Sequence, residues 1–278
     1  MELTPLYGTS PVITLDGNPS DIVEPTIRQR RRLAEALSSF DESQWAHPSR
    51  CEGWSNRDVI IHLDSTNAFW TFSLTQGLAG EPTRFLAAFD PVASPAELVA
   101  GSQGVSSAQM LERFVASTTA FTDLIATISG DGWSALAEAP PGHLDVSAVI
   151  QHALWDSWIH ERDILEPLGI KTEEEPDEIA ASLRYVAALG SGLGITRGET
   201  RRGELALKVT EPDLDIVIDI GDRVAVRSGT ADADLLLVGR AVDLLEALSI
   251  RAPLDQPVPA EHAWMLNGLL ETFGVVVN

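Results

Sequence analysis

The sequence predicts a two-domain α+β protein, in which a four-helix bundle over residues 21–170 precedes an α+β domain with an antiparallel sheet over residues 171–278. The first half contains four segments with apolar residues at helical spacing, whereas the second contains short alternating or β-branched runs between turns. An acidic linker, KTEEEPDE, begins at Lys171 and separates the halves. A chain of 278 residues is also slightly more typical of two domains than of one. Residues 1–20 then form an N-terminal extension.

The first two bundle helices have recognisable ends. The first is expected to start near Asp21 and to end before Asp41. The second has the best-marked start in the chain, because Ser55 fits an N-cap and Asp58 completes a capping box three residues later. Its apolar pattern continues to Gly77.

The connection from Gly80 to Gly104 is long and rich in Pro, Gly and Ser, and its SPAELVAG stretch predicts a short helix. A third amphipathic helix is expected from Met110 to Ile128, and the fourth contains HALWDSWIHERDIL, residues 152–165. Four antiparallel helices are typical of a bundle.

The second half reads as mixed helix and strand. A helical pattern from Ile179 to Leu189 could belong to either domain. GELALKVT, LDIVIDI and DRVAVRSG then predict an antiparallel meander, and ADLLLVG a fourth strand. RAVDLLEALSI and PAEHAWMLNGLLETF predict two closing helices.

The composition restricts the partners of the protein. Its formal charge of −22 repels phosphate backbones and anionic lipids, so nucleic acid and membrane partners are disfavoured. The N-terminus does not resemble a secretory signal, and no stretch of about 18 apolar residues stands out, so we expect a cytoplasmic protein. We also expect it to be a monomer or a weak homodimer. The single cysteine, Cys51, excludes an intrachain disulfide and a Cys-rich metal site. We interpret it as a small core residue, since no cationic neighbour is predictable.

A polar row lies on the fourth helix, where His152, Asp156, His160 and Asp163 fall on one face between apolar residues. Asp156 and His160 are four residues apart, so their Cβ atoms lie about 5–6 Å apart and both side chains can reach one ion. A third ligand must come from another helix, and His62 is the one histidine in the apolar part of another bundle helix. Zinc-like ions accept such ligands, and three protein ligands leave a position open for water, thiol or substrate.

The same residues also fit a buried hydrogen-bond network without a metal, because an Asp can orient a His by itself. In the metal interpretation, His152 and Asp163 are expected to hydrogen-bond around the site, since a fourth protein ligand would close it.

Two stretches resemble the mycothiol-dependent maleylpyruvate isomerase family, a branch of the DinB-like four-helix metalloproteins. WAHPSRCEGWSNRDVIIHL, residues 45–63, is similar to the second-helix signature of that family, and WDSWIHERDIL to its fourth bundle helix. The resemblance implies that His62, Asp156 and His160 bind the metal. The family usually has Glu at the position of Asp156, and the shorter carboxylate could shift the ion or weaken its binding.

The C-terminal half resembles the sterol-carrier-like second domain of the family, and VGRAVDLL resembles a Gly-Arg segment that implies a substrate-binding role for Arg240. Arg162 is our second candidate for a substrate carboxylate. The implied cofactors are a divalent metal, expected to be zinc, and mycothiol, and the other partner is a small electrophile. Cis–trans isomerisation and thiol S-transfer both fit, because a fold does not determine the substrate. The alternatives are a non-catalytic protein that binds an apolar ligand and a metal-dependent hydrolase that needs no thiol.

Overall fold

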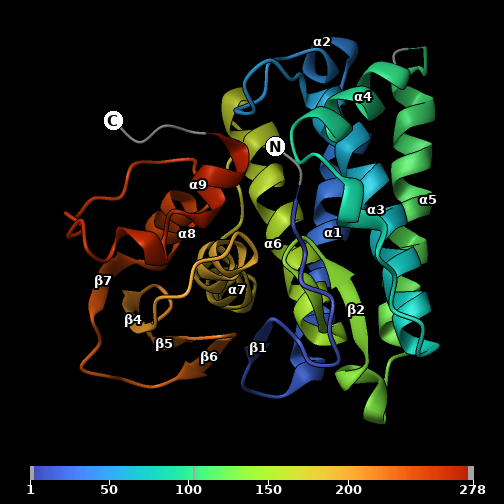
Figure 1. Ribbon diagram of the computed structural model, residues 1–278. Helices are drawn as coiled ribbons and strands as arrows, with labels where there is room; N and C mark the ends of the chain where they lie inside the picture. Colours follow the sequence, from blue (N-terminus) through green and yellow to red (C-terminus); the bar gives the residue numbers. More distant parts are fainter. Residues whose placement is uncertain (1–2, 103, 275–278) are drawn as a thin grey trace.

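The computed structural model describes residues 3–102 and 104–274, and it confirms the two-domain α+β fold class (Figure 1). Four long helices stand side by side at the right of the view and form the bundle, while a sheet, another long helix and two short helices lie at the left. The bundle helices are α1 (Val23–Ser38), α3 (Asn56–Leu78), α5 (Ser107–Ala126) and α6 (Val146–Leu165).

The start of α3 has the predicted capping box. The Ser55 hydroxyl accepts a hydrogen bond from the Asp58 backbone N–H at 3.3 Å, and the Asp58 carboxylate accepts one from the Ser55 N–H at 2.9 Å. The cap fixes the first turn of the helix that carries His62. The short helix α2 (Glu42–Trp45) precedes it, and α4 (Ala93–Gly101) confirms the helix predicted in the long connection.

A small hairpin, β2 (Leu136–Ala139) and β3 (Gly142–Asp145), precedes α6 and was not expected from the sequence. Its strands are too short to show a clear alternation of apolar and polar residues. In β2, the fully buried Glu138 carboxylate holds other segments in place, because it accepts hydrogen bonds from the hydroxyls of Tyr7 and Thr83 and the backbone N–H groups of Phe85 and Leu86.

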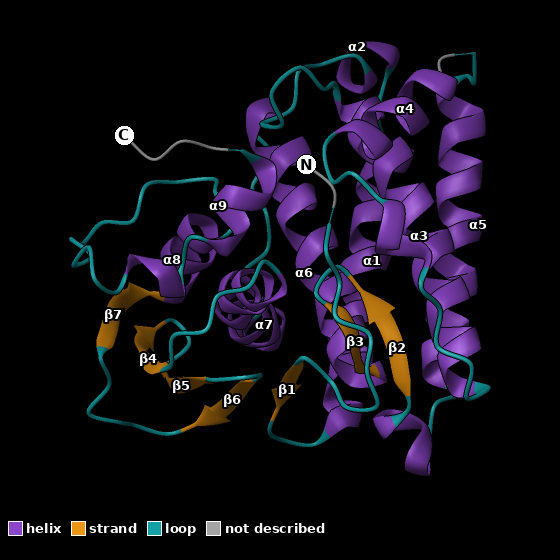
Figure 2. Cartoon of the chain, in the orientation of Figure 1, coloured by secondary structure: helices purple, strands orange, loops and turns teal. Residues whose placement is uncertain are grey.

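The sheet of the C-terminal half has the strand order β1-β6-β5-β4-β7 and is mixed (Figure 2). Its centre is the predicted antiparallel meander of β4 (Gly203–Thr210), β5 (Leu214–Ile220) and β6 (Val224–Ser228). The outer strands correct the expectation of a purely antiparallel sheet, because β7 (Leu235–Arg240) pairs parallel with β4, and β1 (Ile13–Leu15) pairs parallel with β6. The segment predicted as a separate N-terminal extension therefore supplies an edge strand.

The helix α7 (Pro176–Thr196) lies between the sheet and α6 and packs on both (Figure 1). A single cluster of buried apolar residues accordingly continues from the bundle to the sheet, and includes Trp158, Leu189 and Ile218. The domain boundary near Lys171 stays a prediction. By length and mean hydropathy, 1.2 over 18 residues, α7 could cross a membrane, but 67% of that window is buried inside the protein, as in a core helix.

The last two helices cover the same side of the sheet as α7. The first, α8 (Ala241–Leu248), agrees with its prediction. The second is shorter than predicted, because a 3₁₀ turn over Ala263–Met265 precedes α9 (Gly268–Phe273). At Gly268 a Cβ atom would lie 1.8 Å from the Gly190 carbonyl oxygen, so only glycine allows α9 to pack this closely on α7.

Candidate metal centre

Three ligand-type side chains converge between α3 and α6. The Asp156 Oδ1 atom lies 3.7 Å from the His62 Nε2 atom and 3.6 Å from the His160 Nε2 atom. The potential ligand atoms of the three residues all lie within 4.8 Å of one another. The structure thus brings together the three residues that the sequence analysis selected as ligands.

These separations are longer than hydrogen bonds but fit ligands around a shared ion. A hydrogen bond between N and O spans about 2.7–3.2 Å. Ligands at about 2.0–2.1 Å from a tetrahedral zinc ion are roughly 3.3 Å apart, so small side-chain movements would complete such a set. The donor set, two imidazoles and one carboxylate, suits zinc and similar divalent ions.

The electrostatics of the cluster favour an ionised carboxylate. Burial alone would raise the pKa of Asp156, but the neighbouring imidazoles of His62 and His160 hold it well below its usual range. Burial would likewise lower the pKa of His160, but the proximity of Cys51 and the hydrogen bond to Asp163 raise it to about 10.

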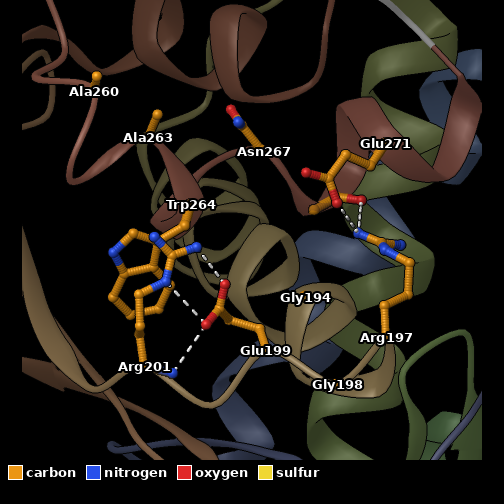
Figure 3. Close-up of a pocket in the computed structure, with 11 residues that line it drawn as sticks. Gly194, Arg197, Gly198, Glu199, Arg201, Ala260, Ala263, Trp264, Asn267 and Glu271 are labelled. Carbon is orange, nitrogen blue, oxygen red and sulfur yellow. Dashed lines mark hydrogen bonds and ion pairs between the residues drawn. The ribbon is translucent and has the colours of Figure 1, made fainter.

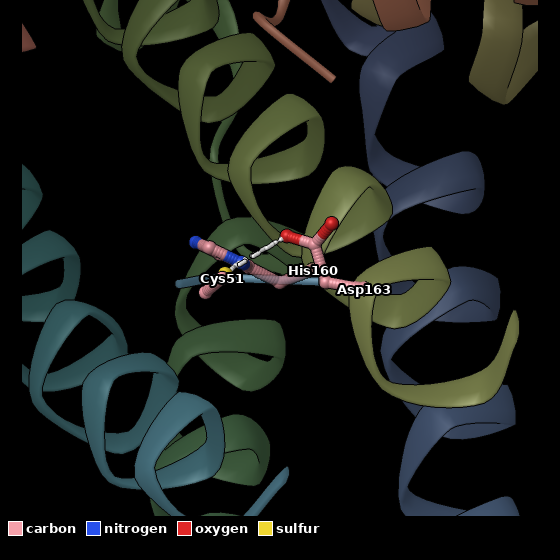
Figure 4. A group of neighbouring side chains, drawn as sticks. All are labelled: Cys51, His160 and Asp163. Carbon is pink, nitrogen blue, oxygen red and sulfur yellow. Dashed lines mark hydrogen bonds and ion pairs between the residues drawn. The ribbon is translucent and has the colours of Figure 1, made fainter. Parts of the chain in front are cut away.

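The second ring nitrogen of His160 is held by Asp163, three residues later on α6. The Nδ1 and Oδ2 atoms lie 2.9 Å apart, and the Asp163 side chain is fully buried (Figure 4). With Nδ1–H donated to this carboxylate, a metal ion at Nε2 would displace the other ring proton of His160, and the Nε2 lone pair would then face Asp156 and His62.

Two arginines that the sequence analysis did not select also bind Asp163. The Arg50 Nε atom lies 3.0 Å from Oδ1, and the Arg251 Nε and Nη2 atoms each lie 2.9 Å from a carboxylate oxygen. Arg50 additionally donates to Glu246 of α8 at 2.7 Å. The bundle and the C-terminal half therefore meet through ion pairs beside the candidate metal centre.

The turn after α8 places Arg251 beside Asp163. The helix ends in a Schellman motif, in which the Arg251 N–H donates to the Glu246 carbonyl at 2.9 Å and the Ile250 N–H to that of Ala247 at 3.1 Å. Glycine usually occupies the left-handed position of this motif, but here Ile250 has a φ of 62°. A β-branched residue in that region is strained by about 1–2 kcal/mol, and such strain clusters at functional sites.

Cys51 packs against the apolar core of the bundle, but it also has polar and charged neighbours. It is partly exposed, and its Sγ atom lies 3.2 Å from the Asp163 Oδ2 atom (Figure 4). The same sulfur lies 3.6 Å from both the Arg251 Nη2 atom and the His160 Nδ1 atom. It therefore has the cationic neighbours that the sequence could not reveal, because Arg251 is 200 residues away along the chain.

His152 lies one turn before Asp156 on α6, but within the described chain it makes no hydrogen bond to the three ligand-type residues. Its Nδ1 atom lies 2.7 Å from the Tyr185 hydroxyl of α7, and its ring packs at 4.8 Å from that of Trp70. Burial lowers the pKa of His152 to about 4, so the ring is neutral at pH 7.

The two arginines selected from the sequence have other partners. Arg240 forms ion pairs with Glu174 and, at 2.7 Å, with Glu211, and no hydrogen bond or ion pair among the described residues joins it to the cluster. Arg162 donates to Glu246 at 2.6 Å and is nearly buried. The arginine of the C-terminal half that binds Asp163, beside the candidate ligands, is therefore Arg251, not Arg240.

A separate pocket of about 400 Å³ lies in the C-terminal half, where the end of α7 faces the segment around α9 (Figure 3). It shares no residue with the cluster at Asp156. Its arginines are paired, Arg197 with Glu271 at 3.3 Å and Arg201 with Glu199. This lining is polar and does not suit an apolar ligand.

Comparisons with known proteins point to one family. Residues 27–165 match the family model described as the mycothiol maleylpyruvate isomerase N-terminal domain. The crystal structure of the mycothiol-dependent maleylpyruvate isomerase superposes with a TM-score of 0.62 at 17% identity, over 88% of this chain and 96% of that one. A point mutant of the same enzyme matches with a TM-score of 0.62 at 16% identity, over 88% and 97% of the two chains. No curated protein gives a significant match.

The structural likeness extends over both halves of the chain, and at this low identity it shows a common fold. The family match covers half of the chain and includes His62, Asp156 and His160. This chain therefore belongs to the mycothiol maleylpyruvate isomerase N-terminal domain family.

Proposed function

We propose that the protein is a metal-dependent enzyme that uses mycothiol to attack a small electrophile, in a cis–trans isomerisation or a thiol S-transfer. The observation that carries this proposal is the convergence of His62, Asp156 and His160, with the far nitrogen of His160 held by Asp163. The family match supports the thiol cofactor.

The residues fit a divalent ion. Two imidazole nitrogens and one carboxylate oxygen face one another with no direct hydrogen bond between them, and three protein ligands leave a position open. The shorter Asp156 in place of the usual Glu still brings Oδ1 within 3.7 Å of both imidazoles. A divalent ion bound here would supply the positive charge that deprotonates a thiol at neutral pH.

The side chains around the site have separate tasks in this proposal. Asp163 keeps the proton of His160 on Nδ1, and Arg50 and Arg251 in turn fix the Asp163 carboxylate. Arg50 is also paired with Glu166 and Glu246, so the two guanidinium groups balance the carboxylates of this network and fix its geometry.

For isomerisation, the thiolate sulfur would form a bond to one alkene carbon of a cis-butenoyl substrate. The former double bond becomes single and can rotate. Expulsion of the thiolate then restores the double bond in the trans form, so the thiol is regenerated. In S-transfer the sulfur would stay attached, and a leaving group would depart instead.

Arg251 is the better candidate for a substrate carboxylate than Arg240, which the sequence suggested. Its Nε and Nη2 atoms bind Asp163, and its Nη1 atom donates to the Ser249 carbonyl at 3.2 Å, which leaves one N–H of Nη1 for a ligand. Arg240 is instead neutralised by Glu174 and Glu211.

Arg251→Met is expected to lower kcat/KM by about 10- to 150-fold, which corresponds to the loss of one charge-assisted hydrogen bond. The matched control, Arg240→Met, is expected to change kcat/KM less than about twofold, because its ion pairs are exposed. Steady-state kinetics on an active substrate, with metal content measured in parallel, test this. A large loss in Arg240→Met with none in Arg251→Met would restore the assignment made from the sequence.

The experiment that tests the proposed function is metal analysis of the purified protein, followed by a screen of electrophiles with and without low-molecular-weight thiols. Turnover that requires both metal and thiol is the expected result. Metal-dependent turnover without thiol would support the hydrolase alternative. A metal-free protein that copurifies with an apolar ligand would support the binding protein, although the polar pocket at Arg197 does not favour it.

A further inference from the structure

Helix α1 presents three arginines to its neighbours, and one of them has no carboxylate partner. Arg32 binds both Glu161 and Glu178 at 2.7 Å, and Arg28 binds Glu178 at 2.9 Å. Arg30 is 1% exposed and forms no ion pair with any described residue. Its one hydrogen bond in the described chain runs from Nη2 to the Ala153 carbonyl of α6, at 3.2 Å.

The rest of the Arg30 guanidinium is buried without polar partners. Its Nε and Nη1 atoms are inaccessible to solvent and have no hydrogen-bond acceptor. The guanidinium carbon lies 4.7 Å from the centre of the Phe121 ring, a cation–π contact. That contact compensates only part of the desolvation of a buried cation, and apolar residues of similar volume often stabilise such positions. The stability of the bundle does not explain this arginine.

The position of Arg30 relates it to the candidate metal centre. The Ala153 carbonyl that accepts its hydrogen bond is three residues before Asp156, so both residues lie on neighbouring parts of one face of α6. Burial lowers the pKa of Arg30 to about 10, and the charge of Asp156 acts in the opposite direction. An arginine side chain is charged at neutral pH, and the bond to the Ala153 carbonyl places this charge within one turn of Asp156 on α6.

We propose that Arg30 is a positioning residue that acts through Asp156: its buried positive charge offsets the negative charge of that ligand. A divalent ion in the site would then keep more of its own charge for an anionic thiol or substrate, at some expense of metal affinity. This inference rests on the proposed function, since it needs a metal at Asp156. It assigns Arg30 to the anion selectivity of the site and not to its folding.

The test compares Arg30→Met with wild type in three measurements. The melting temperature of the metal-free protein is expected to rise by about 2–4 °C, because a desolvated cation is removed. The zinc dissociation constant, from competition with a chelator, is expected to fall about tenfold, which means tighter binding. The dissociation constant of 2-mercaptoethanol for the zinc-loaded protein, measured by thermal shift, is expected to rise about tenfold, which means weaker binding.

Two further variants separate charge from packing. Arg30→Lys keeps the charge, so its zinc and thiol affinities are expected to stay within about threefold of wild type. Arg32→Met removes the partner of Glu161 and Glu178, so it should lower the melting temperature and leave zinc affinity unchanged.

Unchanged zinc and thiol affinities in Arg30→Met would overturn the inference while the proposed function stands. Weakened affinity for both zinc and thiol, with a lower melting temperature, would also overturn it and make Arg30 a folding residue. A wild-type protein that binds no zinc would overturn the proposed function first, before any variant is compared.

Discussion

Replacement of His160 by alanine is expected to weaken zinc binding by at least about 100-fold, because it removes a ligand and also the hydrogen bond that Asp163 makes to it. His62→Ala removes a ligand alone, so its effect is expected to be large but smaller. Elemental analysis after dialysis and a chelator competition measure both. Thiol-dependent activity is expected to fall in parallel.

The folded state is expected to survive these two substitutions. His62 is partly exposed and His160 is buried, but the bundle has an apolar core of its own, and such a bundle does not need a metal to fold. His47→Ala is the matched control, because His47 is only partly buried and makes a local contact to the Pro48 carbonyl. It should retain full metal content. Undiminished metal in both His62→Ala and His160→Ala would contradict the assignment of ligands.

The part of the site that the sequence predicted is the part encoded locally. Asp156 and His160 are four residues apart on one helix, so their proximity follows from helix geometry alone. His62 could be selected because the capping box at Ser55 fixed the start of its helix and its apolar pattern marked an interior helix. The long helices and the central meander were predictable for the same reason.

The rest depends on contacts between distant segments. Arg251 meets Asp163 across 88 positions, and Arg50 meets Glu246 across 196, so no spacing rule relates them. The cluster SRC at Ser49–Cys51, directly before a capped helix, was a weak signal that this loop carries functional side chains. Strand β1 has three residues and pairs with β6 over 200 positions later, so local alternation could not reveal it.

Asp163→Ala is expected to destabilise the protein by about 3–5 kcal/mol, the cost typical of removing one partner from a buried ionic network. The side chain is fully buried, and its loss leaves Arg50, Arg251 and His160 facing one another without the carboxylate between them. Urea unfolding of the metal-free protein measures the difference in the free energy of unfolding. The control is Asp177→Ala, whose ion pair with Arg28 is half exposed and should contribute at most about 1 kcal/mol.

The same carboxylate should also determine how stability changes in acid. Burial alone would raise the pKa of Asp163, but the hydrogen bonds from His160 and Arg251 hold it far below its usual range. A group whose pKa is depressed by folding contributes stability above its unfolded pKa of about 3.9, and that contribution is lost as the pH falls toward the folded value. Wild type should therefore lose stability steeply below about pH 5, whereas Asp163→Asn, which cannot ionise, should show a shallower slope. Equal slopes would mean that the two arginines do not depend on the charge of Asp163, and that the contact between the bundle and the C-terminal half is maintained by packing around α7.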